Sequence, residues 1–388
     1  MRVIRYVVLL LLVVFIISAM TFFNQEITSS NFRYLMKYIE ISPPDFVGDG
    51  ASLKIPVHSD ANYALLSGKI TISDKKQALS YDMNSRKLLD DTHGYKNPMF
   101  VDNGKYLLIY DLDGYSLSVY NSFSKVCEKN FETPIEYVYL DEHGGFAVIT
   151  REKSYAGGVY AYNSNYKKIF SFMTRTASVT DICFDSKKKF LACATTDVKN
   201  GEFYSEIFTF DTDNDEEYKG HTEILGELPL SMFCTDDGFA LVTEAGTYFF
   251  DHNAEKKSFY DFGYDTPDSV YRFPDMFSVK LKSSLGGNEG RVVSFGRKGE
   301  AVFDKAFENE IADISAGYGF LYVLCRDGIH IYSYDDEYTF VGNKTPDVSY
   351  MPEGEYKKIF ACDKNEFLLI TSSGAAKGNL YISDENTR

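Results

Sequence analysis

The chain of 388 residues has no tryptophan, only 10 prolines and few basic residues for its length. The proline count, with 28 glycines, excludes collagen-like and low-complexity proteins. Because 40 Lys and Arg face 56 Asp and Glu, the net charge of −16 argues against nucleic acid as a partner. The 30 Tyr and 31 Phe in turn exclude a disordered acidic chain, since they can bury a large apolar core.

Catalytic motifs are also absent. No nucleophile elbow, phosphate-binding loop or dinucleotide-binding glycine pattern occurs, and no two of the six histidines have the spacing H-x-x-x-H. Four histidines stand in polar turns, where we expect solvated loop residues: His93, His143, His221 and His252. His330 is expected to point from a strand. The sequence therefore predicts no catalytic residue, no metal ligand and no cofactor.

Two acidic segments need separate mention. Residues 211–217 resemble the start of a calcium-binding loop, but Glu216 replaces the glycine at its sixth position and Thr222 replaces the acid at its twelfth. We interpret this segment, and residues 335–337 in the same repeat position, as solvated hairpin turns, with weak cation binding as the alternative.

Six cysteines are present: Cys127, Cys183, Cys193, Cys234, Cys325 and Cys362. None forms C-x-x-C, and five lie in apolar, strand-like runs, which favours buried free thiols over a disulfide framework. Cys183 and Cys193 flank one predicted hairpin turn and are the local pair to test for a disulfide.

The N-terminus carries an uncharged run of 18 residues that begins at Tyr6 and ends at Phe23. As a helix it would span roughly 27 Å, close to the thickness of a bilayer core. A cleaved signal peptide is the competing hypothesis, but residues 17–19 lack a small-x-small cleavage site. We expect an uncleaved transmembrane helix at residues 6–23, which makes the lipid bilayer a partner; a buried soluble helix is the remaining alternative.

The expected topology places residues 1–5 in the cytoplasm and residues 24–388 outside it, as a single-pass plasma-membrane protein. Basic residues on the two sides are nearly balanced, so the short tail decides this orientation. Residues 24–50 are a juxtamembrane connector, in which Phe32, Leu35, Met36 and Ile39 predict a short amphipathic helix. This helix can pack under the main domain or lie on the bilayer.

From residue 51 onward, short apolar runs alternate with turn signals every 8–12 residues, which predicts an all-β domain. An aromatic residue followed by a small polar residue recurs about every 43 residues, the size of a four-stranded propeller blade. The instances begin at Tyr81, Tyr120, Tyr162, Phe210, Phe250, Phe295 and Tyr334, with a degenerate eighth at Ile382. A lysine-containing segment follows several of them and predicts the outer edge strand.

This count predicts an eight-bladed β-propeller over residues 51–388, or seven blades if units merge at the seam. The last unit supplies strands at 358–362, 367–371 and 379–382, and residues 53–57 are expected to add its fourth strand. Such pairing closes the ring and removes a free sheet edge. Glycine-rich residues 286–290 and 374–378 are expected to form loops.

Three segments carry a family resemblance: NYALLSGK at 62–69, YKNPMFVDNGK at 95–105 and LLIYD at 107–111. Together they resemble an uncharacterised family of membrane-anchored β-propellers from Gram-positive bacteria, related to quinoprotein-like and WD40-like propellers. The resemblance covers nearly the whole chain and implies architecture and location but no activity. The absent tryptophan departs from the quinoprotein blade motif, since RKLL at 86–89 stands in its place, and this weakens any link to a quinone cofactor.

The leading functional hypothesis is a non-enzymatic binding module at the cell envelope, whose ligand is a protein, a peptide or a wall-associated molecule. The second is a hydrolase or lyase that acts on envelope polymers from the central channel. The enzyme hypothesis requires several carboxylates or histidines to converge at the axis. Sensing through the membrane helix is a third and weaker option.

Overall fold

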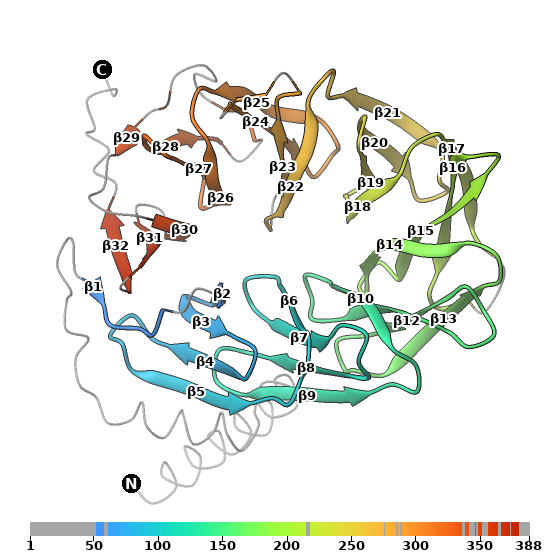
Figure 1. The fold of residues 1–388 in the computed structure, drawn as a ribbon, viewed down its shortest axis with the longest axis horizontal. Coiled ribbons are helices and arrows are strands. Elements are labelled where there is room, and N and C mark those ends of the chain that lie inside the picture. The colour runs from blue at the N-terminus through green and yellow to red at the C-terminus, as the bar shows by residue number, and fades with distance from the viewer. Residues whose placement is uncertain are drawn as a thin grey trace, which may run out of the picture.

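The computed structural model describes residues 52–379 except 58–60, 215–217, 275, 285, 288, 336–337, 341–345, 347, 351–355, 364–365 and 373. In this described part, 32 β-strands form eight four-stranded antiparallel sheets arranged as a ring, and no helix occurs (Figure 1). Within the same residues, no helix is long and apolar enough to cross a membrane. The predicted transmembrane helix at 6–23 and the connector at 24–50 lie outside the described residues. The all-β, eight-bladed prediction is confirmed, and the seven-bladed alternative is wrong.

In each blade the strands follow one another in chain order from the centre of the ring outward, and in the last blade the N-terminal β1 is added as the outermost strand. Blades 1–4 contain β2 (Asn62–Leu66), β3 (Lys69–Ser73), β4 (Gln77–Tyr81) and β5 (Lys87–Thr92); β6 (Pro98–Asp102), β7 (Leu107–Asp111), β8 (Ser116–Tyr120) and β9 (Lys125–Asn130); β10 (Ile135–Leu140), β11 (Phe146–Thr150), β12 (Gly157–Tyr162) and β13 (Lys168–Thr174); and β14 (Ser178–Asp185), β15 (Phe190–Lys199), β16 (Glu202–Asp211) and β17 (Gly220–Leu225).

The remaining strands complete blades 5–8. They are β18 (Pro229–Cys234), β19 (Gly238–Thr243), β20 (Gly246–Asp251) and β21 (Lys256–Asp261); β22 (Thr266–Arg272), β23 (Met276–Lys282), β24 (Gly290–Gly296) and β25 (Ala301–Phe307); β26 (Ile311–Gly317), β27 (Phe320–Cys325), β28 (Gly328–Ser333) and β29 (Val348–Tyr350); and β30 (Tyr356–Asp363), β31 (Glu366–Thr371), β32 (Ala375–Asn379) and the N-terminal β1 (Ser52–Leu53). The predicted lysine-containing edge strands are β5, β13 and β21, each the outermost of its sheet.

Ring closure occurs as predicted, through an N-terminal strand in the last blade, but at different residues. β1 pairs with β32 over only two residues, Leu53 lying opposite Ala375. The expected strand at 53–57 is therefore wrong beyond Leu53. Chain direction changes there because the Ile55 backbone N–H donates to the Leu53 carbonyl at 3.1 Å, and Pro56 has no N–H to give to a ladder.

The last blade also corrects the glycine-rich loop expected at 374–378, because residues 375–379 form β32. The backbone of Gly378 contacts the ring of Phe367, and a Cβ atom at this position would lie only 2.2 Å from the ring. The glycine thus serves close packing rather than loop flexibility. The strand expected at 379–382 begins four residues earlier, and Ile382 lies outside the described residues.

The recurring aromatic-polar pair has a structural reason. Asp82 Oδ1 accepts hydrogen bonds from the backbone N–H groups of Asn84 and Arg86 at 2.9 and 2.8 Å, which holds the turn between the third and fourth strands. Asn163 and Asp251 make the same two contacts in their blades. Aspartate and asparagine recur because they build this turn. The third residue after the polar one has a left-handed backbone in four blades: Ser85, Tyr166, Ala254 and Tyr338.

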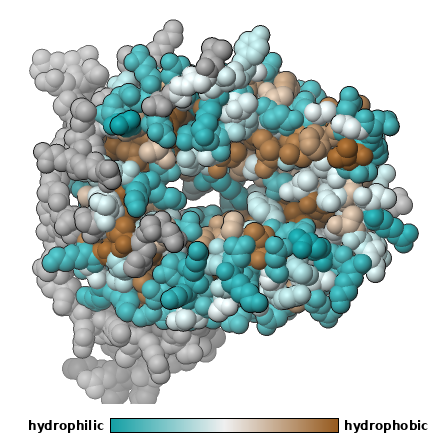
Figure 2. Space-filling view, in the orientation of Figure 1, coloured by the Kyte–Doolittle hydropathy of each residue, from teal (hydrophilic) through white to brown (hydrophobic). Residues whose placement is uncertain are grey.

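Large aromatic rings fill the space between blades, as expected from the Tyr and Phe content. Phe233 of blade 5 stacks on Phe277 of blade 6 with ring centres 4.6 Å apart. The ring centres of Tyr322 in blade 7 and Phe367 in blade 8 are 5.8 Å apart. These contacts bury large side chains between sheets and hold neighbouring blades together. The ring remains open at its centre in the space-filling view (Figure 2).

Antiparallel connectivity gives the ring two different faces. Turns after the second strand of each blade and the connections between blades share one face, which we call the connection face. It includes the turns 74–76, 112–115, 151–156, 200–201, 244–245 and 326–327 and the connections 93–97, 131–134, 175–177, 226–228, 262–265 and 308–310. The opposite face carries the turns between first and second strands and between third and fourth strands.

Candidate functional site

Neighbouring blades are tied together on the opposite face, at the ends of the innermost strands. Asn103 Nδ2 donates to the Asp141 carbonyl at 2.6 Å, and an Asp141 carboxylate oxygen accepts the Ser186 N–H at 2.8 Å. Lys188 Nζ donates to the Asp236 carbonyl at 2.9 Å. Burial raises the pKa of Asp141, although three backbone N–H groups partly offset this effect. The turns of blades 2–5 therefore form a hydrogen-bonded chain.

Two arginines of blade 6 then cross the axis to blade 3. Arg272, at the end of β22, donates from Nη1 to the Leu140 carbonyl at 2.8 Å and covers the Tyr139 ring, with its guanidinium carbon 4.3 Å from the ring centre. Arg297 lies 3.1 Å from the Glu142 carboxylate and 3.3 Å from that of Asp236. Leu140 and Glu142 belong to blade 3, which blades 4 and 5 separate from blade 6 along the chain, so these two contacts bridge the ring. Asp236 belongs to the adjacent blade 5.

The cavity beside these arginines is too small for a substrate. It has a volume of about 20 Å³ and is lined by residues that include Glu142, Cys234, Arg272 and Arg297. That volume holds about one water molecule. The arginine bridges thus leave no ligand-sized opening at this place on the opposite face.

Two buried carboxylates lie on innermost strands, where the enzyme hypothesis looks for catalytic acids. Asp181 Oδ1 and Oδ2 accept the N–H groups of Ile182 at 2.8 Å and of Met232, in the next blade, at 2.6 Å. Asp313 Oδ2 likewise accepts the N–H of Ile359 in its next blade at 3.0 Å. Burial raises the pKa of Asp181 to about 7 and that of Asp313 to about 6. Each carboxylate bridges two blades, and among the described residues neither hydrogen-bonds another carboxylate or a histidine.

The six cysteines are free thiols, as predicted. Cys183 pairs across the sheet with Ala192, and Cys193 with Ile182, so the two sulfurs lie on opposite faces of their sheet and cannot form the disulfide considered above. Cys183 instead lies in the hydrophobic core against which Cys234 of the next blade packs.

The connection face carries most of the exposed apolar surface. Among the described residues, 11 large apolar side chains are exposed, and 8 of them lie at this edge: Met99, Tyr115, Tyr155, Val198, Phe203, Leu225, Leu230 and Tyr264. Tyr264 is 90% exposed. These residues lie in turns, at strand ends and in one connection, from blade 2 to the connection that enters blade 6. Exposed apolar side chains thus gather on one half of this face, and we call these eight residues the apolar surface of blades 2–6.

A long hairpin projects from this surface. β15 and β16 have 10 residues each, whereas most other strands have 5–7, and β14 reaches only to Thr196 on β15. Beyond that point Val198 pairs with Phe203, and both side chains are exposed at the tip. The hairpin thus adds an apolar edge to the connection face.

The histidines meet the predictions unevenly. His143 is exposed and His330 points from β28, as expected, and His252 lies in a turn. His93 corrects the prediction of a solvated loop residue: it is buried, its ring stacks on Tyr95 at 4.9 Å, and burial lowers its pKa. His221 is the second residue of β17 rather than lying in a turn, although the residue is exposed.

The described residues 211–214 of the acidic segment form a turn after β16, as predicted, and residues 215–217 lie outside the described residues. Asp211 Oδ1 accepts the Asp213 N–H at 3.0 Å, and the Asp213 carboxylate pairs with Lys189. An ion pair of this kind fits the solvated interpretation.

Two other groups gather possible metal ligands that the sequence analysis missed. Cys325, Asp327 and His330 place their ligand atoms within 4.8 Å of one another, and so do Glu206, His221 and Glu223. The first group is readable in the sequence as C-x-D-x-x-H around an Asp-Gly pair, which is a hairpin-turn signal. That spacing was the available signal, because a two-residue turn returns the chain to the same sheet face.

Solved structures of the same fold are similar to the chain along most of its length. The BamB protein of Moraxella catarrhalis is 12% identical with a TM-score of 0.50, covering 84% of this chain and 98% of that chain. The C-terminal WD40 domain of Sif2 is 10% identical with a TM-score of 0.54, covering 86% and 98%. Sqt1 of Saccharomyces cerevisiae is 11% identical with a TM-score of 0.50, covering 86% and 100%.

No curated protein matches the chain in sequence. The similarity to the solved structures establishes the β-propeller fold. The predicted resemblance to an uncharacterised propeller family is confirmed by residues 50–377, which match the family described as "Family of unknown function (DUF5711)", and the chain belongs to that family.

Proposed function

We propose that this chain is a non-enzymatic binding module, anchored in the plasma membrane by residues 6–23 with its propeller outside the cytoplasm. The observation that carries the binding role is the gathering of 8 of 11 exposed large apolar side chains on the connection face. A propeller presents such loops on a rigid scaffold, which suits recognition of a protein or peptide. The apolar run from Tyr6 to Phe23 supports the anchor.

Binding fits the axis better than catalysis does. Asp181 and Asp313 each use one carboxylate oxygen to accept a backbone N–H of the next blade, which is a structural use. Beside Arg272 and Arg297 the cavity admits about one water. An envelope hydrolase or lyase would need acids free to reach a substrate there.

Crosslinking on intact cells tests the binding face. Tyr264→Asp and Phe203→Asp place charge on the connection face, and each is expected to lower the yield of the crosslinked partner about tenfold. Tyr318→Asp is the matched control, because this exposed tyrosine lies in a turn of the opposite face. Equal yields for all three variants, or turnover of an envelope polymer by the purified protein, would contradict the proposal.

Protease treatment of intact cells tests the topology separately. A propeller outside the cytoplasm is expected to be degraded or released, while a cytoplasmic marker protein survives. Survival of the propeller under the same treatment would place it inside and remove the envelope role, while leaving the binding face open to the crosslinking test.

A further inference from the structure

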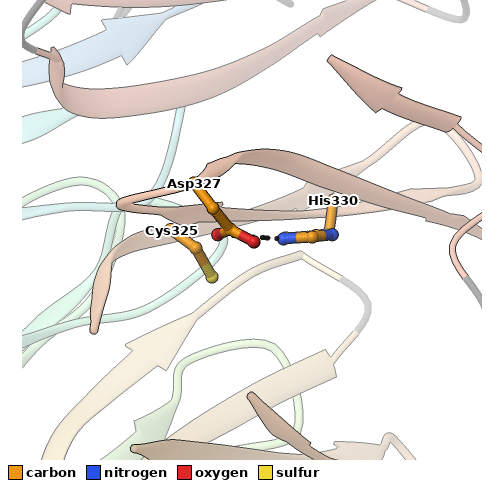
Figure 3. Close-up of side chains that lie close together, drawn as sticks. All are labelled: Cys325, Asp327 and His330. Atoms are coloured by element: carbon orange, nitrogen blue, oxygen red, sulfur yellow. Dashed lines mark hydrogen bonds and ion pairs between the residues drawn. The ribbon is translucent and has the colours of Figure 1, made fainter. Parts of the chain in front are cut away.

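The hairpin between β27 and β28 brings a thiol, a carboxylate and an imidazole together. Cys325 ends β27, Asp327 lies in the two-residue turn, and His330 follows in β28. Cys325 lies opposite Gly328, so His330, two residues further on, is on the same sheet face as Cys325. Figure 3 shows the three side chains on one side of the hairpin.

Their separations are near those of metal ligands. His330 Nε2 lies 3.3 Å from Asp327 Oδ1, and all three ligand atoms lie within 4.8 Å of one another. Two ligands about 2.0–2.1 Å from a tetrahedral zinc ion are themselves about 3.3–3.4 Å apart. The Cys325 sulfur lies within 4.8 Å of the other two ligand atoms, so it is placed to supply the third corner of such a tetrahedron when the three ligands close on an ion.

The donor set selects the kind of ion. Thiolate and imidazole suit zinc and similar transition metals, whereas calcium and magnesium take oxygen ligands. Cys325 is 5% exposed, so the sulfur lies on the protein side of the group. Phe307 packs against the His330 ring at 5.8 Å and limits its movement.

An open position faces the other side. Asp327 and His330 line a cavity of about 400 Å³ between blades 6 and 7, bordered by Lys305, Glu308 and Asn309. A zinc site with three protein ligands keeps its fourth position for water or a ligand, and this cavity gives that position room.

The second group, Glu206, His221 and Glu223, is a weaker candidate. It contains no thiol, His221 and Glu223 are exposed, and the Tyr204 hydroxyl already donates to Glu223. Phe208 stacks on the His221 ring at 4.8 Å. This group is therefore a suitable control for the first.

We propose that Cys325, Asp327 and His330 form a three-ligand site for a zinc ion, with the fourth position open to the cavity beside β25. The site goes beyond the binding role proposed above and does not depend on it. It lies at the connection face, on blade 7, outside the apolar surface of blades 2–6.

Cobalt is the probe that reports the sulfur ligand. The full-length protein, stripped of metal with a chelator, is titrated with Co²⁺ alone. We expect one ion per chain and a thiolate-to-cobalt charge-transfer band in the near ultraviolet, which zinc then abolishes by displacement. Cys325→Ser is expected to remove the band, while Asp327→Asn and His330→Gln weaken binding at least tenfold.

Matched variants keep the test decisive. His221→Ala is expected to bind cobalt like the parent protein. Asp327→Asn and His330→Gln change partly exposed side chains, 44% and 20% exposed, so these two variants still test cobalt binding if Cys325→Ser does not fold. Circular dichroism verifies that each variant is folded. Absence of the band in the parent, or a band that survives Cys325→Ser, would reduce the group to a hairpin ion pair and overturn the proposal.

Discussion

The Asp181 carboxylate accepts a hydrogen bond from the backbone N–H of Met232 at 2.6 Å, which joins the innermost strands of blades 4 and 5. Asp313 repeats this contact with Ile359 between blades 7 and 8. Both aspartates follow a register shift in their strand, which turns the side chain along the ring toward the next blade. The ring is therefore locked by aspartates in two of its interblade seams.

This lock makes stability depend on pH. Burial raises the pKa of Asp181 to about 7 in the folded protein, above its ordinary value of 3.8 in the unfolded chain. The folded state thus holds the proton more tightly. The contribution of Asp181 to stability is complete below pH 4 and is lost as the pH rises toward 7, by at most about 1.4 kcal/mol per pH unit.

Asp181→Asn tests whether the stabilising contribution of Asp181 decreases as the pH rises. The variant is expected to lose about 1–3 kcal/mol of unfolding free energy at low pH, because the amide accepts fewer hydrogen bonds. The difference from the parent is then expected to shrink between pH 4 and 7. Urea unfolding over that range measures it, and parallel curves for the two proteins would show that Asp181 does not titrate there.

The arginine bridge across the axis predicts a second effect. Arg272→Met removes the hydrogen bond to the Leu140 carbonyl and the contact with the Tyr139 ring, at a cost of about 2–4 kcal/mol. Arg297→Met is expected to cost about 1 kcal/mol, since Arg297 and Glu142 are about a third exposed. Denaturant midpoints compare the two variants. A larger loss of unfolding free energy for Arg297→Met than for Arg272→Met would contradict the prediction that Arg272 makes the stronger bridge.

Sequence periodicity predicted the ring because each blade repeats the same local chemistry. Asp82 and its equivalents build a turn from contacts within five residues, so their spacing is visible in the chain. The bridge from Arg272 to Leu140 spans 132 residues, and no local pattern encodes it. The buried position of His93 was missed although its partner Tyr95 is local, because Tyr95 packs against core residues of blades 1 and 2 and the polar neighbours in the sequence do not show this.

The metal-ligand group was readable from the sequence in part, unlike the long-range arginine bridge. Cys325, Asp327 and His330 are local, and the Asp327-Gly328 pair is a hairpin-turn signal, so the face that Cys325 and His330 share was readable from the register of that hairpin. The apolar surface of blades 2–6 was not readable, because its members come from turns, strand ends and one connection that are far apart in the sequence. Only the closed ring brings those segments to one face.

The cysteines give a prediction about reactivity. Burial raises the pKa of Cys183 and Cys193 well above the ordinary thiol value, and it raises that of Cys362 to about 12. At pH 8 these side chains are thiols rather than the reactive thiolates. Alkylation of the native protein is expected to leave Cys183 and Cys193 unmodified, whereas all six cysteines react in urea. Peptide mass spectrometry reads the result, and native modification of Cys193 would contradict the burial described here.

Closure of the ring depends on the two-residue pairing of β1 with β32, in which Leu53 is the buried side chain. Leu53 is 5% exposed and packs in the core that includes Ile370 and Ala375, while the side chain of Lys54 is exposed. Leu53→Ala is expected to cost about 2–4 kcal/mol and to expose the edge of β32 to proteolysis. Lys54→Ala, one residue away, is expected to change the unfolding free energy by less than about 0.5 kcal/mol. Equal midpoints and equal cleavage near Ala375 in the two variants would mean that β1 does not hold the ring closed.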